Sequence, residues 1–381
     1  FAVMRTKALP LQSHGNLHLH AKKERSVPAM ENITKLSQKP KVVSIFSGCG
    51  GLDYGFHVEG YETIWANDFA EWACKSFAAN FGDVIHYKDI TQINPYTDTS
   101  IPACDIVLGG FPCQDFSIIW KQPGLNGTRG GLFRHFAEFV DAKKPKAFVA
   151  ENVKGLLTAN DGRAIDTIIR DFESIAPGYV VKPHLYNFAE YGVPQFRERV
   201  LFVGIRIDTG FDFVHPKPTH GPNGSLPYVT ARMALEGVEA VPVNNERMKI
   251  TDIPRDSPYY VKGMISHVYR RIKLDEPSKT IIAAGGGGTW GYHFPDPRPL
   301  TNRERARLQS FPDDFVFEGS IAEVRRQIGN AVPPNGVREL AKRLLPLFTG
   351  EYTPVDLRPE YEKMKAMTVK QRLEYVTSQM N

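Results

Sequence analysis

Residues 41–51 read KVVSIFSGCGG, a β-branched apolar run that passes directly into a glycine-rich turn. The residues that follow the turn read as the start of a helix. Glycines at such a turn let the backbone bend tightly and approach a ligand without a Cβ in the way. A strand, a glycine turn and a helix in this order predict the first unit of an α/β sheet, with a plain tight connection as the simpler alternative.

Comparable apolar runs recur along the chain and alternate with stretches of helical pattern. Ile165, Ile168, Ile169 and Phe172, for example, fall at helical spacing. This alternation predicts a parallel, doubly wound sheet. The further strand-like runs are TIWA (63–66), DIVL (105–108), AFVA (147–150) and VLFVGI (200–205), and the helix-like stretches are 69–80, 131–141, 163–175, 301–310 and 335–348.

The composition is that of an ordinary globular protein: of 381 residues, 42% are hydrophobic and 23% are charged. No apolar run approaches the length needed to cross a membrane, and residues 1–40 lack the apolar core of a secretory signal. The four cysteines have no zinc-like spacing, so we expect free thiols, no metal and a cytoplasmic location. The net charge of +5 suits a polyanionic partner but does not require one.

Two acidic residues follow strand-like runs after the glycine turn. Asp68 ends the run IWAND, about twenty residues past the glycines, where a ribose diol is commonly held. Asp89 stands where a third strand would end, and either residue taken singly is more often a helix cap. Asp53 occupies the third glycine position of the dinucleotide pattern GxGxxG, which argues against a nicotinamide cofactor. The turn and both acids favour a nucleoside-type cofactor at the carboxyl ends of the strands.

The stretch GGFPCQDFS (109–117) displays a thiol just past the end of a predicted strand. Its glycines and proline shape a turn, so Cys113 is a candidate nucleophile rather than a buried structural thiol. Glu151 and Asn152 end the next strand and are expected in the same cleft. A carboxyl group there can hydrogen-bond or protonate a substrate atom, with a helix cap as the alternative. In QFRER, Arg197 and Arg199 share one face if the segment is extended, and suit carboxylate or phosphate oxygens, with a surface salt-bridge pair as the alternative.

These segments together resemble the DNA (cytosine-5)-methyltransferase family, from about Lys41 to Phe348. Each segment alone is weak evidence, whereas the full set in the family's order is specific. The resemblance implies an α/β fold: a Rossmann-like sheet of S-adenosylmethionine-dependent methyltransferases with a second, smaller, loop-rich target-recognition domain. The matching segments are FSGCGG (46–51), the ND of WAND (65–68), KDI (88–90), GGFPCQDFS (109–117), RGGLF (129–133), ENV (151–153), QFRER (195–199), LTNRERARLQSFP (300–312) and QIGNAVPP (327–334).

The resemblance also implies residue roles. Cys113 adds to cytosine C6, Glu151 contacts N3 and the exocyclic amine, and Arg197 and Arg199 support them. Methyl transfer from S-adenosylmethionine to C5 follows, after the base has left the duplex. The implied cofactor residues are Phe46, Gly48, Gly50, Gly51, Asp68, Phe69, Asp89, Ile90, Pro112, Leu132, Asn330 and Val332.

The segment 114–130 is implied to be a mobile loop that closes over double-stranded DNA. It departs from the family's usual small residues at Ile119-Trp120, and we favour packing of the indole over insertion into the base stack. HVYRRIK (267–273) suits phosphate contacts, although such a run is usually a solvated face. The expected DNA contacts are Gln114, Ser117, Arg129, Arg270 and Arg271.

The expected organisation is a discontinuous catalytic domain interrupted by a Pro- and Gly-rich recognition domain. A helix from near Asn335 is expected to return to the first sheet, so that QIGNAVPP completes the cofactor pocket. The boundaries are 1–40 for a flexible extension, 41–207 and 301–349 for the catalytic domain, 208–300 for the recognition domain and 350–381 for a C-terminal tail.

The leading hypothesis is a sequence-specific DNA modification enzyme of the restriction–modification type. It acts as a monomer on DNA beside a separately encoded endonuclease and has no membrane partner. One alternative is the branch of the family that methylates tRNA, but that branch carries a further cysteine motif after the arginine pair, and here no cysteine follows Cys113. Another is a DNA-binding regulator without turnover, against which the intact Cys113, Glu151 and arginine pair argue.

Overall fold

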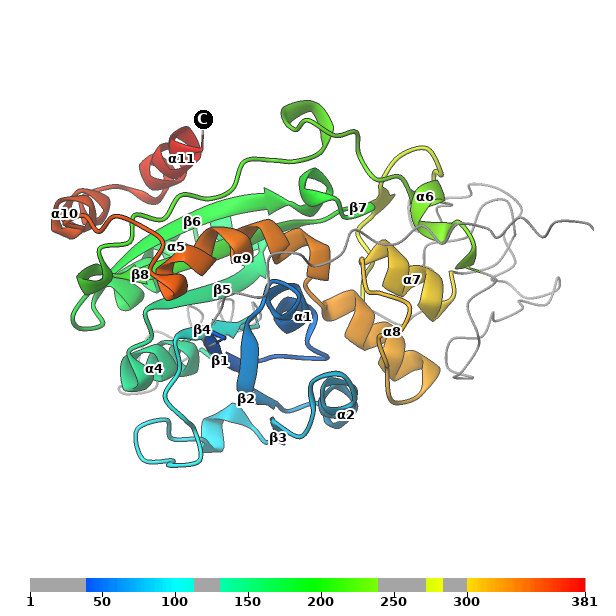
Figure 1. Ribbon diagram of the computed structural model, residues 1–381, viewed down its shortest axis with the longest axis horizontal. Coiled ribbons are helices and arrows are strands. Elements are labelled where there is room, and N and C mark those ends of the chain that lie inside the picture. Colours follow the sequence, from blue (N-terminus) through cyan, green and yellow to red (C-terminus); the bar gives the residue numbers. More distant parts are fainter. Residues whose placement is uncertain (1–38, 113–130, 239–271, 284–299, 381) are drawn as a thin grey trace, which may run out of the picture. The chain divides into compact units, whose positions relative to one another are not determined.

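The computed structural model describes residues 39–112, 131–238, 272–283 and 300–380 (Figure 1). Seven of its described strands form one sheet in the order β3-β2-β1-β4-β5-β8-β6. The first five strands of this order are parallel, whereas β8 runs antiparallel to both β5 and β6. The strands are β1 Lys41–Ile45, β2 Glu62–Asp68, β3 Ile85–Tyr87, β4 Ile106–Gly109, β5 Ala147–Val153, β6 Tyr179–Asn187 and β8 Glu198–Arg206.

The strand expected over 200–205 forms as β8, but its direction departs from the predicted parallel pattern. It follows β6, a strand that the sequence patterns did not single out, after a short connection. Such a connection suits an antiparallel pair, because a parallel crossover needs about a dozen residues or more. The sheet is otherwise the predicted doubly wound sheet, and the α/β fold class is confirmed.

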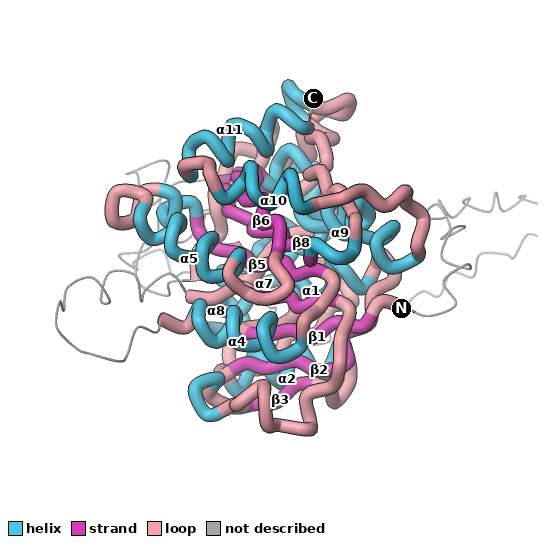
Figure 2. Tube along the Cα trace, turned by 90° about the vertical axis from the view of Figure 1, so that its left-hand side faces the viewer, coloured by secondary structure: helices cyan, strands magenta, loops and turns pink. Residues whose placement is uncertain are grey.

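Helices cover both faces of the column of strands seen in Figure 2. α1 and α9 pack on one face through side chains such as Phe56, and α4 and α5 on the other through side chains such as Phe136. Val42 and Val43 of β1 point to opposite faces, so both faces are apolar, as a doubly covered sheet requires. The helices near the sheet are α1 Gly51–His57, α2 Glu71–Phe81, α4 Phe133–Lys143, α5 Arg163–Glu173 and α9 Pro334–Thr349, with single 3₁₀ turns η2 Ile90–Gln92, η3 Lys154–Leu157, η4 Phe188–Tyr191, η5 Ile207–Thr209 and η6 Gly221–Asn223.

A third apolar cluster lies apart from the two that cover the sheet. It joins the helices α6 Ala231–Leu235, α7 Asn302–Leu308 and α8 Ile321–Asn330 with Ile281 and with Cys49 of the glycine turn. The two-stranded pair of β7 Gln195–Phe196 with β9 Ser278–Lys279 leads into this cluster through Ile281. α9 belongs instead to a sheet cluster, so residues 301–349 are divided between two hydrophobic cores.

The last described residues form α10 Arg358–Lys365 and α11 Val369–Gln379, which pack against the edge strand β6. Arg372 anchors them through a buried ion pair with Glu173 of α5. Lys182 of β6 is also buried and donates a 2.7 Å hydrogen bond to the carbonyl oxygen of Phe213. In the described part of the chain, no helix is both long enough and apolar enough to cross a bilayer.

Candidate active site

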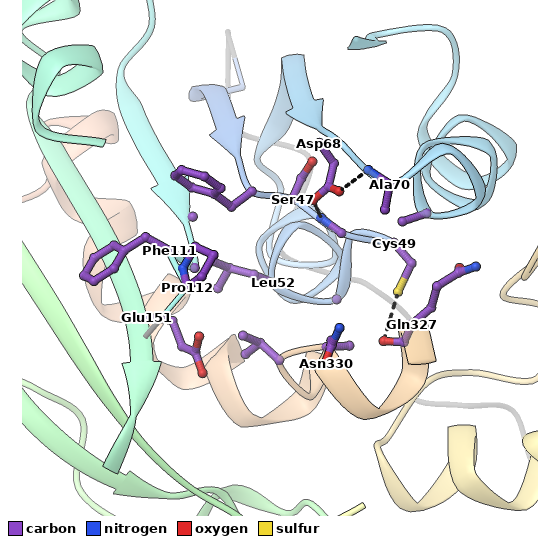
Figure 3. A pocket seen from close by; sticks show the side chains of 18 of the residues that line it. Ser47, Cys49, Leu52, Asp68, Ala70, Phe111, Pro112, Glu151, Gln327 and Asn330 are labelled. Atoms are coloured by element: carbon purple, nitrogen blue, oxygen red, sulfur yellow. Dashed lines mark hydrogen bonds between the residues drawn. The ribbon is translucent and has the colours of Figure 1, made fainter. Parts of the chain in front are cut away.

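The glycine turn between β1 and α1 forms one side of a cavity (Figure 3). Gly48 and Gly50 have φ angles of 56° and 91°, in the left-handed region that glycine adopts without a steric penalty. A Cβ atom at Gly51 would lie 2.3 Å from the carbonyl oxygen of Val332. Glycine at this position therefore lets the returning end of the chain close the cavity against the turn.

Asp68, the last residue of β2, holds the glycine turn in place. Its Oδ2 accepts a 2.8 Å hydrogen bond from the Gly48 N–H, and its Oδ1 accepts one of 2.8 Å from the Ala70 N–H (Figure 3). Burial raises the pKa of this carboxyl group, and the backbone donors oppose the rise. Phe69 lines the same cavity with 67% of its surface exposed, so its ring is free to pack on a flat ligand.

The ends of β4 and β5 form another side of the cavity. Gly110 and Pro112 follow β4, and Glu151 lies on β5 (Figure 3). A Cβ atom at Gly110 would lie 2.9 Å from Glu151 Oε2, so glycine leaves room for the carboxylate. Asn152 Nδ2 donates a 2.9 Å hydrogen bond to the Phe111 carbonyl oxygen and fixes the turn after β4 to β5.

Glu151 pairs with Arg199 of β8, the strand next to β5. The Arg199 Nε lies 2.8 Å from Glu151 Oε1, and the two side chains are 15% and 13% exposed. Burial raises the pKa of Glu151, while the positive charges of Arg199 and Arg197 oppose the rise. A carboxyl group held between these opposing effects is suited to hydrogen-bond or protonate a substrate atom.

Arg197 also borders the cavity, but both terminal nitrogens of its guanidinium are hydrogen-bonded within the protein. It is 1% exposed, and its Nη1 and Nη2 donate 3.0 Å hydrogen bonds to the carbonyl oxygens of Ile281 and Gly329. Burial lowers the pKa of Arg197 to about 9, and repulsion from Arg199 adds to the effect. The two arginines of QFRER therefore share the cavity, as predicted, but only Arg199 meets Glu151.

The cavity has a volume of about 590 Å³, which suits a small-molecule ligand. It lies at the carboxyl ends of β1 and β4, and α1 and α4 after them go to opposite faces of the sheet. Such a topological switch point is the common ligand site of open α/β sheets. The predicted site residues that line the cavity are Phe46, Gly48, Gly51, Asp68, Phe69, Pro112, Glu151, Arg197, Arg199, Asn330 and Val332.

Four predicted cofactor residues lie elsewhere. A Cβ atom at Gly50 would meet two phenylalanine rings of α2, so this glycine shapes the turn from behind. Asp89 caps η2, because its side chain accepts a 2.9 Å hydrogen bond from the Thr91 N–H. Ile90 and Leu132 belong to the apolar packing of the sheet, where they support the fold rather than the cavity.

Several predicted residues lie outside the described part of the chain, namely Cys113, Gln114, Ser117, Arg129, Arg270 and Arg271. Pro112, the residue before Cys113, lines the cavity. Burial raises the pKa of the described thiols Cys49, Cys74 and Cys104 to about 12, so they stay protonated at neutral pH. The residues that the structure describes include no group of three or more His, Cys, Asp or Glu side chains that could hold a metal.

The cavity also contains residues that the sequence patterns did not single out. Leu52 directly follows FSGCGG, and Gln327 begins QIGNAVPP. Cys49 lies within the glycine turn, and its thiol is 3.9 Å from the Gln327 carbonyl oxygen (Figure 3). The sequence shows the motifs that contain or adjoin these residues. A single sequence does not show which residues of a motif face a cavity.

A family model described as C-5 cytosine-specific DNA methylase matches residues 40–345. The type II methyltransferase M.NgoFVII of Neisseria gonorrhoeae is 63% identical, covering 90% of this chain and 96% of its own. M.BbvI of Brevibacillus brevis, also a type II methyltransferase, is 38% identical over 85% of this chain and 96% of its own.

Solved structures share the fold at lower identity. A prophage-encoded protein of E. coli matches with a TM-score of 0.65 and 22% identity, covering 82% of this chain and 100% of its own. S. pombe Dnmt2 methyltransferase matches with a TM-score of 0.55 and 18% identity, covering 81% of this chain and 99% of its own. The chain belongs to the C-5 cytosine-specific DNA methylase family and is a DNA (cytosine-5)-methyltransferase that takes its methyl group from S-adenosylmethionine.

Proposed function

We propose that the enzyme methylates C5 of one cytosine within a specific sequence of double-stranded DNA, with Cys113 as the nucleophile. The observation that carries this proposal is the Glu151–Arg199 pair in the cavity, which Pro112, the neighbour of Cys113 in the chain, also lines. The shared lining of Glu151 and Pro112 supports the role that the resemblance gives to Cys113, the next residue in the chain.

The cavity fits the cofactor on grounds of shape and polarity. Phe69, whose ring is exposed, would hold the purine, and Asp68, which lines the cavity with the glycine turn, would hold the ribose. Asn330 and Val332, from the returning end of the chain, line the cavity as well. When bound, the cofactor supplies an electrophilic methyl group.

In the proposed reaction, the Cys113 thiolate adds to C6 of the flipped-out cytosine. Glu151 hydrogen-bonds N3 and the exocyclic amine while the ring gains electron density, and Arg199 keeps Glu151 oriented. C5 then takes the methyl group, the C5 proton is lost, and the Cys113–C6 bond breaks to release the product and the thiolate. Covalent addition divides one difficult step into easier ones, and positioned acid–base help contributes ~10²–10⁴-fold.

Base flipping and DNA binding use residues outside the described part of the chain. Unstacking a base costs roughly a few kcal/mol, which contacts to the DNA must offset. We assign those contacts to the segment 114–130 and to the basic run 267–273, through Gln114, Ser117, Arg129, Arg270 and Arg271. The net charge of +5 supports this assignment, because cationic surfaces attract the phosphate backbone.

We also propose that the recognition domain includes more than residues 208–300. α7 and α8 share their hydrophobic core with α6 and Ile281 rather than with the sheet. A boundary near Ala331, before α9, follows this division of the cores. The extension 1–40 precedes the catalytic domain in the sequence. Residues 350–380 contribute Leu357, Met364 and Val376 to the hydrophobic core of the sheet, so we assign them to the catalytic domain rather than to a separate tail.

The type II relatives suggest the biological role. We propose that the enzyme is the modification half of a restriction–modification system, acts in the cytoplasm as a monomer on DNA, and protects sites against a separately encoded endonuclease.

Transfer of tritiated methyl groups from S-adenosylmethionine tests the substrate. Duplex DNA is expected to be labelled and bulk tRNA is not, and bisulfite sequencing of DNA from expressing cells should show one recurrent site. Labelling of tRNA alone would support the tRNA branch, and binding of DNA without labelling of either would indicate a regulator.

A further inference from the structure

Two fully buried glutamines meet outside the lining of the cavity. Gln195 lies on β7, and Gln309 follows α7; both have 0% of their surface exposed. Gln195 Nε2 donates a 2.9 Å hydrogen bond to Gln309 Oε1 and a 3.2 Å hydrogen bond to the Leu308 carbonyl oxygen. Burying a primary amide costs free energy unless its N–H groups and its oxygen are hydrogen-bonded. These hydrogen bonds therefore hold the two glutamine side chains in one arrangement.

Each glutamine also reaches one further segment of the chain. Gln195 Oε1 accepts a 2.8 Å hydrogen bond from the Ile281 N–H, just after β9. Gln309 Nε2 donates to the Ile328 carbonyl oxygen near the end of α8. The pair therefore connects four segments that are far apart in the sequence: β7, the residues after β9, the end of α7 and the end of α8.

Arg197 uses the same two outer segments. The Ile281 N–H donates to Gln195 Oε1, and the Ile281 carbonyl oxygen accepts from Arg197 Nη1. Arg197 Nη2 holds the Gly329 carbonyl oxygen at 3.0 Å. A Cβ atom at Gly329 would lie 2.3 Å from the Ala283 nitrogen, so the two segments are in direct backbone contact at this point.

We call the contacts of Gln195, Gln309 and Arg197 with the backbone of Ile281, Ile328 and Gly329 the joint. The joint supports two walls of the cavity. One wall is the segment from Gly329 to Val332, and the other carries Arg197 and Arg199. We propose that Gln195 and Gln309 are positioning residues of the methyltransferase, which hold Arg197 beside the Glu151–Arg199 pair and hold the Gly329–Val332 wall against the cofactor. The first half of this role rests on the function proposed above; the second concerns cofactor binding alone.

The joint predicts a signature in the pH dependence as well as in the rate. Arg199 and Arg197 both oppose the rise in the pKa of Glu151 that burial causes. If the joint loosens and the cations move away, the pKa of Glu151 rises further. The limb of the pH profile of kcat that depends on Glu151 therefore moves to higher pH, and a Glu151→Gln variant identifies that limb by removing it.

The experiment uses the full chain with the near-isosteric variants Gln309→Met and Gln195→Met and the double variant. Asn302→Met is the matched control, because Asn302 is a buried amide on the same α7 that donates to the Ile321 carbonyl oxygen and does not line the cavity. Each single variant is expected to lower kcat roughly 10- to 100-fold, to shift the Glu151 limb upward, and to weaken binding of S-adenosylhomocysteine roughly tenfold. Calorimetry of that ligand needs neither DNA nor turnover, so it tests the joint even if the proposed function fails.

The double variant separates positioning from plain stability. Replacing both partners of a buried hydrogen bond by apolar groups is often nearly neutral for stability, so the unfolding midpoint should recover in part. The Ile281 N–H still lacks its acceptor, so kcat, the Glu151 limb and ligand affinity should stay perturbed. Recovery of all three together with stability, or an unshifted limb and unchanged affinity in the single variants, would overturn the proposal. A control variant that reproduces the same shifts would do so as well.

Discussion

Two of the glutamate–arginine pairs between elements of this enzyme differ in what surrounds them. Glu151 and Arg199 meet between β5 and β8, with 13% and 15% of their side chains exposed at the cavity. Glu173 and Arg372 join α5 to α11 and are only 4% and 3% exposed. The second arginine also donates to two backbone carbonyl oxygens, so its hydrogen-bonding groups are used within the protein.

The comparison shows that the same chemical pair can fasten a fold or face a ligand. Burial raises the pKa of both glutamates, and the arginine partner opposes the rise in each case. The electrostatics are therefore alike in direction, and access to a cavity is what separates the two sites. Substitutions at the first pair should act on the reaction, and substitutions at the second should act on stability.

The largest effect is expected for Glu151→Gln. The amide keeps the shape and can still accept from Arg199, but it cannot donate a proton, so kcat should fall roughly 10²–10⁴-fold. Steady-state rates with saturating S-adenosylmethionine measure this, and thermal unfolding should show a nearly unchanged midpoint. A variant that keeps its kcat within a few fold, or that unfolds far earlier than the wild type, would break the comparison.

Arg372→Met should lower stability and leave the reaction rate unchanged. It leaves Glu173 buried without a cation and is expected to lower the free energy of unfolding by about 3–5 kcal/mol, with kcat of the folded enzyme unchanged. Urea unfolding and rate measurements on the same samples check both statements.

The double variant Glu173→Leu, Arg372→Met is the control for this pair. Replacing both buried charges by apolar groups is often neutral, so most of the lost stability should return. If Arg372→Met instead lowered kcat as strongly as Glu151→Gln, the two pairs would not have separate roles.

Asp53 sharpens the comparison, because its buried carboxylate is hydrogen-bonded to the hydroxyl groups of Ser44 and Thr63 rather than to an arginine. Burial raises its pKa from 3.8 to about 6. The folded state then binds the proton more tightly than the unfolded state, so the stabilisation is present at low pH and is lost as the pH rises from about 4 to about 6. Relative to Asp53→Asn, the wild type should lose about 3 kcal/mol of unfolding free energy across this window. Chemical denaturation at several pH values measures it, and parallel pH curves for the two proteins would contradict it.

The smallest effect is expected for Phe69→Ala at the rim of the cavity. Loss of ring packing on the cofactor should cost about 1 kcal/mol of binding, which is roughly fivefold in Kd, with little change in stability. Tyr87→Ala is the matched control, since Tyr87 is 62% exposed and does not line the cavity. Equal Kd values for the two variants would remove Phe69 from the cofactor site.

The sequence predicted the parts of the molecule that local patterns encode. These parts include the apolar runs, the glycine turn and the residues Asp68 and Glu151 near two strand ends. Because the carboxyl ends of parallel strands share one edge of a sheet, Asp68 and Glu151 could be predicted to lie in one cleft. The direction of β8 could not be predicted, because the length of the connection before β8 is informative only once β6 has been identified. Asp89 illustrates a local alternative that prevailed, since its side chain caps η2.

Long-range pairings left no local signal at all. Gln195 and Gln309 are ordinary polar residues in the sequence, and only the fold brings them together in a buried site. The same holds for Glu173 and Arg372, which are far apart in the chain. Such pairs depend on which helices pack against which strands, and a single sequence does not specify this.

Covalent trapping on DNA that contains 5-fluorocytosine tests the central claim most directly. In this base a fluorine replaces the C5 hydrogen and cannot leave as a cation, so the thiol cannot be eliminated after methyl transfer. Peptide mapping by mass spectrometry then locates the DNA adduct. The account predicts a denaturation-resistant adduct on Cys113 in the wild type and in Arg372→Met, and none in Cys113→Ala. An adduct on Cys49 or another residue, or full methylation by Cys113→Ala, would contradict it.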